Sequence, residues 1–368
     1  MGTGTLSVLV VGGGIAGLAA ARALRLRGIE AHVVERSTSR TQPGTGVYLP
    51  ANAVRAIGEL GLADDLAARA HVISSQKFLD HEGVALFEVG LADFWREAGP
   101  CLALGHADLR DLLGDGVPVS GGRTVTALDD EADRVVATFD DGSRSGYDVV
   151  VGADGVRSWV RSACLSGQHP SFLGQVSWRF VVHDAPDVPG WTVWLGRRAT
   201  FLAVPLGGSR TYCFAAVDGR TPSGPIAGEQ DVLPRVFGGF AEPVPAMIRA
   251  RRSQLRPYFS PIEEVVQRPW TRGRVVLVGD AAHAMSPNMA EGVGMAVEDG
   301  LVLAETIAAG RPLAEFEAGR RPRVEFVQAQ THRRDRARNL PAFVRDPVLR
   351  RLGPQMFRGN YQRLLSPR

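Results

Sequence analysis

The chain has 368 residues, a length that commonly folds as about two domains. Hydrophobic residues make up 45% of the sequence and charged residues 22%, which is ordinary globular usage and excludes disorder of the whole chain. The formal net charge is only +3 at pH 7, so the composition gives no sign of a nucleic-acid or membrane-surface partner.

The N-terminal part begins with a strand–helix–strand pattern. Residues 6–11 form a run that is apolar except for Ser7, which is typical of a buried parallel strand. Residues 15–27 are rich in Ala and Leu and predict a helix, and residues 32–34 predict a second strand. The elements predicted next are helices over residues 51–60 and 108–113 and strands over residues 124–128, 135–139 and 147–151. An Asp141-Gly142 turn is expected to join the last two strands as a hairpin.

The middle of the chain changes to short β-rich runs separated by Gly and Pro. Strands are predicted over residues 176–182, 192–195, 200–204 and 211–217. We expect them to form an antiparallel sheet that carries Trp178, Trp191 and Trp194. The elements predicted after the sheet are a helical region over residues 233–251, an apolar strand over 274–279 and a long helix over 292–309.

The C-terminal tail is rich in arginine. Residues 311–368 carry fourteen arginines and five acidic residues, in a helical pattern that Pro341 interrupts. The tail lacks the interleaved aromatic residues of a nucleic-acid site, so we expect a solvated helix that caps the neighbouring domain, and no nucleic-acid partner. The whole order predicts an α/β fold, in which a Rossmann-like domain is interrupted by a β-rich substrate domain and followed by a C-terminal helical tail.

A dinucleotide-binding motif follows the first predicted strand. Residues 12–17 are Gly-Gly-Gly-Ile-Ala-Gly, which supplies the G-x-G-x-x-G spacing between a strand and a helix. Gly12 allows a tight turn, Gly14 lets the backbone approach a pyrophosphate, and Gly17 lets helix and strand pack closely. The helix N-terminus then offers unpaired N–H groups to the phosphates. Glu35 ends the second strand and disfavours a 2′-phosphate, so FAD or NAD is expected rather than NADP.

Two later motifs place an aspartate after a strand. Residues 149–158 run from an apolar strand into Asp154 and Gly155, and residues 274–283 do the same at Gly279 and Asp280. An aspartate at such a strand end can accept hydrogen bonds from sugar hydroxyls. The glycines of Glu291-Gly292-Val293-Gly294 can let backbone N–H groups close on a polar ring edge or a phosphate.

In this order and spacing, the three motifs resemble those of the FAD-dependent aromatic-ring hydroxylases, the group A flavoprotein monooxygenases of the p-hydroxybenzoate hydroxylase fold. The resemblance covers nearly the whole chain. It implies FAD as the cofactor, NADH or NADPH as co-substrate, and O2 as oxidant. One oxygen atom would pass through a flavin C4a-hydroperoxide to an aromatic or conjugated heterocyclic small molecule. The domains expected on this basis are an FAD-binding domain over residues 1–70, 101–165 and 266–320, a substrate domain over 71–100 and 166–265, and a helical segment over 321–368.

The resemblance also assigns roles to residues. The AMP half of FAD would be held by Gly12, Gly14, Ile15, Ala16, Gly17, Glu35 and Arg36, with Val125 beside the adenine. Asp280, next to Gly279, would bind the ribityl chain. The flavin's pyrimidine edge would be covered by Pro287, Ala290, Glu291, Gly292, Val293 and Gly294. Asp154 and Arg157 belong to a stretch that the family associates with both FAD and NAD(P)H.

The sequence departs from the family pattern at two places. His106 stands where the family usually has an arginine near the start of a helix. Arg110 lies one helical turn further on the same face, so we expect it to take over part of the FAD contact. The usual Gly-Gln-Gly of the last motif is Ala290-Glu291-Gly292 here.

Substrate contacts are expected from the β-rich domain, which would keep water from the reaction. The candidates are Trp178, Arg179, Trp194, Phe201, Tyr212 and Phe214. Side chains alternate along a strand, so Trp178 and Arg179 take opposite faces and the candidates cannot all line one pocket. Arg210 is the first choice for a polar substrate contact, because the resemblance directs its strand toward the flavin, and Arg179 is the second. The alternative for each arginine is a surface ion pair. Tyr48 is expected beside the isoalloxazine ring.

Other functions stay open at this point. The same scaffold could support epoxidation or Baeyer–Villiger-type oxygenation. His106 and Glu291 raise the alternative of a flavin-binding accessory protein without turnover. A plain NAD-dependent dehydrogenase does not need the motifs at Asp154 and Asp280.

The three cysteines are widely separated. They form no CxxC or Cys/His spacing, so we expect neither a disulfide framework nor a metal site. This pattern favours a reduced, cytoplasmic protein. No apolar run is long enough to predict a membrane span. A monomer and a homodimer are both compatible with the sequence.

Overall fold

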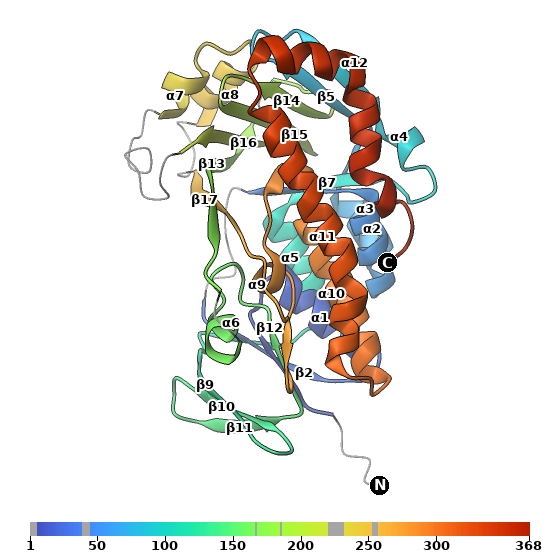
Figure 1. Cartoon of the computed structure of the whole chain (residues 1–368), viewed down its shortest axis with the longest axis vertical. Coiled ribbons are helices and arrows are strands. Elements are labelled where there is room, and N and C mark those ends of the chain that lie inside the picture. The colour runs from blue at the N-terminus through green and yellow to red at the C-terminus, as the bar shows by residue number, and fades with distance from the viewer. Residues whose placement is uncertain (1–5, 39–44, 166–167, 185, 220–231, 252–256) are drawn as a thin grey trace.

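A computed structural model describes residues 6–38, 45–165, 168–184, 186–219, 232–251 and 257–368. Two large sheets organise it, and they lie toward opposite ends of an elongated molecule (Figure 1). One is a six-stranded, mostly parallel sheet and the other a seven-stranded, mostly antiparallel sheet. The predicted mixed α/β class is confirmed.

The six-stranded sheet forms around the first strand of the chain. β1 (Val8–Val11) lies between β2 (Ala31–Glu35) and β12 (Val149–Gly152), and both pairings are parallel. The order is completed by β19 (Val275–Leu277) and β18 (Thr271–Arg272) beyond β12, and by β8 (Val119–Gly121) beyond β2. Every residue of β1 is buried, as its continuous apolar sequence predicts.

Helices α1 (Ile15–Arg25) and α10 (Gly292–Ala308) pack closely on each other. A Cβ atom at Gly300 of α10 would lie 2.8 Å from the backbone nitrogen of Ala20 in α1. Only glycine permits this approach, because any larger side chain would push the two helices apart. The contact holds α10, which begins at Gly292, against α1, which follows the glycine motif of residues 12–17.

Two small sheets flank this domain. One contains β9 (Val125–Asp130), β10 (Val135–Phe139) and β11 (Arg144–Tyr147), and the other contains β3 (Gly46–Leu49), β7 (Cys101–Gly105) and β4 (His71–Ile73). The prediction that residues 135–139 and 147–151 form a hairpin was wrong, because the strand that forms the hairpin with β10 is β11. The chain divides at Asp148, whose side chain accepts from the Ser7 backbone N–H at 2.8 Å. The residues before Asp148 pair with β10, and those after it join the parallel sheet.

The seven-stranded sheet draws its strands from two separate parts of the chain. Its order is β17 (Tyr258–Glu264), β13 (Ser171–His183), β16 (Arg210–Asp218), β15 (Ala199–Gly207), β14 (Trp191–Leu195), β5 (Ser75–Asp80) and β6 (Ala85–Gly90). β14 and β5 are parallel, an exception to the predicted antiparallel sheet that arises because β5 comes from the earlier segment. One face packs on α7 (Val232–Phe237) and α8 (Val244–Ala250) in a separate apolar core.

The remaining helical segments are short. They are α2 (Ala51–Ile57), a π-helical turn (Gly58–Leu62), α3 (Ala63–Arg69), α4 (Leu91–Phe94), α5 (His106–Gly114), α6 (Trp159–Cys164), α9 (Asp280–His283) and a 3-10 turn (Pro287–Met289). Within the described ranges, no helix combines the length and the apolar character that crossing a membrane requires.

The C-terminal tail joins the two ends of the molecule. α11 (Leu313–Arg338) begins near α10 and runs toward the seven-stranded sheet, where α12 (Ala342–Tyr361) and a final 3-10 turn (Gln362–Leu364) follow (Figure 1). α12 packs on β6, and Gly353 permits the contact because a Cβ atom there would overlap the Phe87 ring. The tail therefore covers both domains, whereas the sequence predicted a cap on one.

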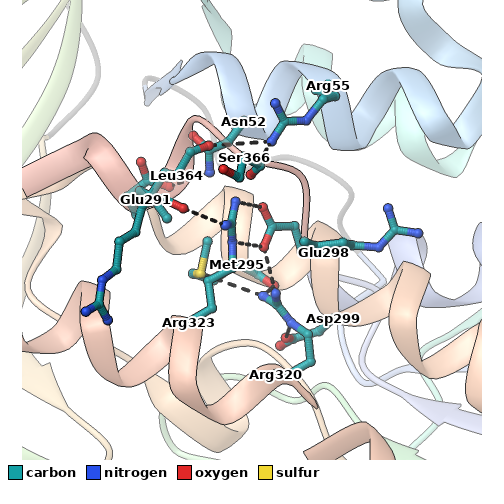
Figure 2. Close-up of polar contacts among 12 residues, drawn as sticks. Asn52, Arg55, Glu291, Met295, Glu298, Asp299, Arg320, Arg323, Leu364 and Ser366 are labelled. Atoms are coloured by element: carbon teal, nitrogen blue, oxygen red, sulfur yellow. Dashed lines mark hydrogen bonds and ion pairs between the residues drawn. The ribbon is translucent and has the colours of Figure 1, made fainter. Parts of the chain in front are cut away.

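A buried ion-pair network anchors this tail (Figure 2). Arg320 of α11 donates to Asp299 at 2.8 Å and to Glu298 at 2.7 Å, both on α10. Arg323 also bonds Glu298, at 2.9 and 3.0 Å. Burial alone would raise the pKa of Asp299, but His283 and Arg320 outweigh it and lower that pKa. The charges are compensated only while all partners stay together.

We predict that Arg320→Ala destabilises the protein by about 3–5 kcal/mol, because it removes the one cation that the buried Asp299 and Glu298 share. Urea unfolding followed by circular dichroism measures the change. The control is Arg311→Ala, which removes an exposed pair with Glu315 at 3.5 Å and should cost less than about 0.5 kcal/mol. Equal losses in the two variants would contradict the anchoring role.

Candidate active site

A cavity of about 920 Å³ lies between the nucleotide-binding motif, the seven-stranded sheet and the C-terminal tail. Its walls come from the glycine motif, the loop before α10, one face of the seven-stranded sheet and helices α11 and α12. Residues far apart in the sequence therefore line one cavity.

The glycine motif forms an open cradle at one side of this cavity. Gly12 has φ +115°, a conformation that favours glycine, and a Cβ atom there would overlap the Ala153 carbonyl. At Gly14, by contrast, a Cβ atom would meet nothing within 4 Å. No side chain caps the N-terminus of α1, so its first N–H groups are available to an anion. Gly14, Ile15 and Ala16 line the cavity.

Two charged side chains hold the loop of this cradle. Glu35 accepts from the Gly13 backbone N–H at 2.8 Å and from the Ser37 N–H at 2.9 Å. The Arg110 Nε donates to the Gly13 carbonyl at 3.0 Å. The structure thus places Arg110 against the nucleotide loop. Arg36 is exposed beyond Glu35, while Val125 is buried at the start of β9, and neither lines the cavity.

Asp154 and Arg157 differ in their surroundings. The Asp154 carboxylate accepts from the Ser158 hydroxyl and from the backbone N–H groups of Trp159 at 2.7 Å and Val160 at 3.1 Å. It therefore caps α6, and burial raises its pKa. Arg157 lines the cavity and pairs with Glu263 at 3.0 Å.

The second aspartate lies on the cavity wall. Asp280 begins α9 and lines the cavity. Desolvation by the surrounding protein raises the pKa of its carboxyl, and the nearby His283 and Arg179 oppose this shift. The preceding Gly279 has φ +58° and donates its N–H to Asp299 at 2.9 Å. The buried anchor of the tail thus also fixes the strand end that presents Asp280.

The loop before α10 contributes an unevenly exposed set of residues. Pro287, Ala290, Gly292 and Val293 line the cavity. Glu291 and Gly294 do not.

Glu291 is instead fully enclosed. Asn52 of α2 donates to it at 2.9 Å (Figure 2), and burial raises its pKa to about 8. Gly294 permits this packing, because a Cβ atom there would lie 3.1 Å from the Glu291 Oε2. The sequence analysis did not identify Asn52 as a partner of Glu291. The one feature of the sequence that marks Asn52 is its polar side chain in a mostly apolar helix.

Register decides which of the expected aromatic residues reach the cavity. Arg179, Tyr212 and Phe214 line it. The inclusion of Trp178, Trp194 and Phe201 as pocket candidates was wrong, because these three side chains lie on the other face, in the core with α7 and α8. Strand alternation separates the two sets: Arg179 is paired with Phe214, while the adjacent Trp178 is paired with Ala215.

The two candidate arginines have different environments. Arg210 lies outside the cavity lining and pairs with Asp108 at 3.4 Å. Arg179 lies in the cavity between two aromatic rings, 5.6 Å from the Phe214 centroid and 5.8 Å from that of Tyr258. The geometry therefore favours Arg179 over the first choice from sequence.

Tyr48 and His106 supply polar groups to the same cavity. The Tyr48 hydroxyl accepts from Gln76 at 3.2 Å, and its ring meets Trp191 edge-on at a centroid distance of 4.4 Å. Burial raises the pKa of Tyr48 well above 10. Burial, Arg110 and Arg179 lower the pKa of His106. Both groups are therefore neutral hydrogen-bonding partners near pH 7.

The tail brings residues that the sequence analysis did not connect with the site. Arg333, Arg334 and Arg338 of α11 line the cavity, as does Met356 of α12. The arginine-rich composition was visible, but its position over the substrate sheet depends on how the tail folds back.

These features are typical of a nucleotide-dependent oxidoreductase, with a nucleotide cradle that opens into a large cavity. The sequence matches the family described as an FAD binding domain over residues 5–343, and the chain belongs to that family. The open backbone at Gly14 and the uncapped helix N-terminus fit the pyrophosphate of FAD. The protein is a FAD-dependent monooxygenase, as the resemblance predicted.

Known proteins are similar to this chain in sequence and in fold. A 3-amino-4-hydroxybenzoate 2-monooxygenase of Streptomyces platensis is 33% identical over 91% of this chain and 89% of its own. The 2-heptyl-3-hydroxy-4(1H)-quinolone synthase of Pseudomonas aeruginosa is 32% identical over 89% and 88%. The HpxO protein of Klebsiella pneumoniae, complexed with FAD and uric acid, matches with a TM-score of 0.78 and 26% identity over 99% of this chain and 94% of that chain.

We predict that Glu291→Gln changes the pH dependence of stability. A carboxyl whose pKa rises from 4.5 to about 8 on folding binds more protons in the folded state, so wild-type stability falls as pH rises through this window. The neutral amide can still accept from Asn52. The variant should therefore gain on the order of a few kcal/mol relative to wild type at pH 9, and far less at pH 5.

Urea midpoints at the two pH values measure this difference. Glu315→Gln is the control, because Glu315 is exposed and forms only a surface pair with Arg311. A stability difference between Glu291→Gln and wild type that does not change with pH would contradict the burial of an ionisable Glu291.

Proposed function

We propose that this monooxygenase hydroxylates an aromatic or conjugated heterocyclic small molecule, with NADH or NADPH as the electron donor. The observation that carries the proposal is the single cavity shared by the nucleotide cradle and the face that presents Arg179, Tyr212 and Phe214. One relative is named as a monooxygenase of an aminohydroxybenzoate and another as a synthase of a hydroxyquinolone, and both names support an aromatic ring. The net reaction converts substrate, NAD(P)H, a proton and O2 into hydroxylated substrate, NAD(P)+ and water.

The chain's own residues bind and orient the substrate. Arg179 is placed to hold an acidic or phenolic oxygen, and the Phe214 ring to contact the aromatic plane. The neutral Tyr48 and His106 add hydrogen-bonding groups without adding charge. Apolar side chains such as Val193 and Leu202 keep water from the reacting atoms.

The proposed FAD contacts follow the cradle. Gly14 and the first residues of α1 would accept the pyrophosphate, in a turn that Gly12 and Gly17 allow. Glu35 would bind the ribose, and Asp280 the ribityl chain. When bound there, FAD supplies the redox chemistry that accepts hydride and activates O2. The discontinuous domain division is likewise proposed, because strands of the seven-stranded sheet come from both segments assigned to the substrate domain.

We also propose a cytoplasmic protein that works as a monomer or a homodimer. The support for a reducing location is that all three cysteines are free.

An absorption spectrum of the purified protein tests the proposed function first. We expect flavin bands that NADH or NADPH bleaches, and bleaching that accelerates when an aromatic acid is present. Mass spectrometry should then detect a product heavier by one oxygen atom. A flavin that neither NADH nor NADPH reduces would favour a flavin-binding accessory protein without turnover. A product with an oxygen inserted next to a carbonyl would favour Baeyer–Villiger-type oxygenation, and an epoxide product would favour epoxidation.

We predict that Arg179→Gln lowers kcat/KM for an anionic aromatic substrate by about 10- to 100-fold, because a charge-assisted hydrogen bond is lost. Arg249→Gln, which disrupts an exposed pair with Glu242, is the control and should stay within about twofold. Arg210→Gln compares the two candidates. A larger loss for Arg210→Gln than for Arg179→Gln would favour the first choice from sequence.

A further inference from the structure

A continuous row of paired residues crosses the whole seven-stranded sheet. Arg179 on β13 is paired with Tyr258 on one side and Phe214 on the other. From Phe214 the row continues through Leu202, Val193 and Phe78 to Phe87. Each strand contributes one residue, and all of these residues line the cavity. Arg179 is the one charged member of the row.

The row is much longer than a single aromatic ring. Neighbouring strands lie about 4.8 Å apart, so the four strand spacings between Arg179 and Phe78 correspond to roughly 19 Å. Between these two residues the row contains only Phe214, Leu202 and Val193. At its far end, the Phe78 and Phe87 rings stack with a centroid distance of 4.3 Å.

Helix α12 forms a roof over this far end. Leu349, Met356 and Phe357 of α12 line the cavity together with Phe78 and Phe87.

Arg334 also reaches the far end, where the partners found for it among the described residues are neutral groups. It donates to the Tyr361 hydroxyl at 3.1 Å and lies 5.8 Å from the Phe78 ring centroid. The sheet and the tail thus enclose an apolar slot.

The charged end has a different character. Among the described residues, no hydrogen bond or ion pair is found for the Arg179 guanidinium, which lies over the rings of Phe214 and Tyr258. The Asp280 carboxyl feels its charge, but beyond ion-pair distance. The cavity's Arg157 and Arg338 form ion pairs with Glu263 and Asp218 respectively, and Arg333 donates to the Gln330 side chain. Arg179 is half-buried, so an anionic partner would compensate a charge that the protein leaves unpaired.

We propose that the substrate is an amphipathic aromatic acid or phenol. Its anionic oxygen binds Arg179, its ring contacts Phe214, and an apolar substituent of several carbons extends past Leu202 and Val193 toward Phe78, beneath α12. The proposal rests on the proposed function, because it concerns the substrate of the same site.

Matched probes test both ends of the slot without turnover. Salicylate, 4-hexylsalicylate and 4-hexylsalicylamide are titrated into the FAD-loaded protein, and the perturbation of the flavin absorption spectrum gives each Kd. The hexyl chain should tighten binding of salicylate at least about 30-fold, since each buried methylene can contribute about fourfold. The carboxylate should bind more tightly than the amide. A hexyl advantage below threefold in the wild-type protein overturns the proposal.

Variants locate the two ends. Val193→Trp fills the middle of the row and should reduce the hexyl advantage to less than threefold. Val348→Trp is the matched control, because Val348 lies on α12 with 37% of its surface exposed and does not line the cavity. Met356→Glu is a second variant, on the half-buried roof, and should also reduce the advantage. Arg179→Gln should abolish the preference for carboxylate over amide.

The outcomes separate this proposal from the proposed function. If the hexyl advantage persists and responds to Val193→Trp while no probe or other aromatic is oxygenated, the substrate class stands and the proposed function fails. If salicylate is oxygenated but the hexyl chain brings no advantage, the function stands and the amphipathic substrate is overturned. A hexyl advantage that survives both Val193→Trp and Met356→Glu would place the chain elsewhere and also overturn the proposal.

Discussion

The buried pairing of Arg320 with Asp299 and Glu298 couples the tail to the nucleotide site. Asp299 accepts from the Arg320 guanidinium, from the His283 ring at 2.6 Å and from the backbone N–H of Gly279. One carboxylate therefore connects α11, α9 and the strand end that presents Asp280. Removing one partner would leave a buried charge uncompensated. The position of α11 is therefore coupled to the position of Gly279 and Asp280 on the cavity wall. The roof of the cavity depends on this same anchor, since α12 follows α11.

Strand register imposes the second constraint. A sheet residue faces either the cavity or the core with α7 and α8, and its neighbour along the strand faces the other way. This rule leaves the large aromatic residues Trp178, Trp194 and Phe201 in the core and gives the cavity a narrower set with one arginine. The arrangement gives the two faces different roles: one packs in the core with α7 and α8, and the other lines the cavity.

The departures from the family pattern have structural accommodations. Arg110 reaches the carbonyl of Gly13, so a cation still contacts the nucleotide loop although His106 replaces the usual arginine. Glu291 replaces a neutral residue, and its burial with Asn52 raises its pKa to about 8. A protonated Glu291 therefore resembles the amide that it replaces. Both changes are compatible with the FAD-dependent enzyme to which the family assignment leads.

The sequence by itself determined the nucleotide cradle and the mixed α/β class of the fold. The cradle depends on residues within one strand–turn–helix unit, where glycine spacing and helix geometry dictate the backbone. Tertiary structure decided the partner of Asp148, the exclusion of Arg210 from the cavity, the Glu291–Asn52 contact and the position of the arginine-rich tail. Each of these depends on side chains that are distant in sequence and meet only after register and packing are set. The preference for Arg179 over Arg210 as the arginine of the cavity has the same cause. Alternation along the strand predicts that Arg179 and Trp178 lie on opposite faces, but only the assembled sheet and tail show which face lines the cavity.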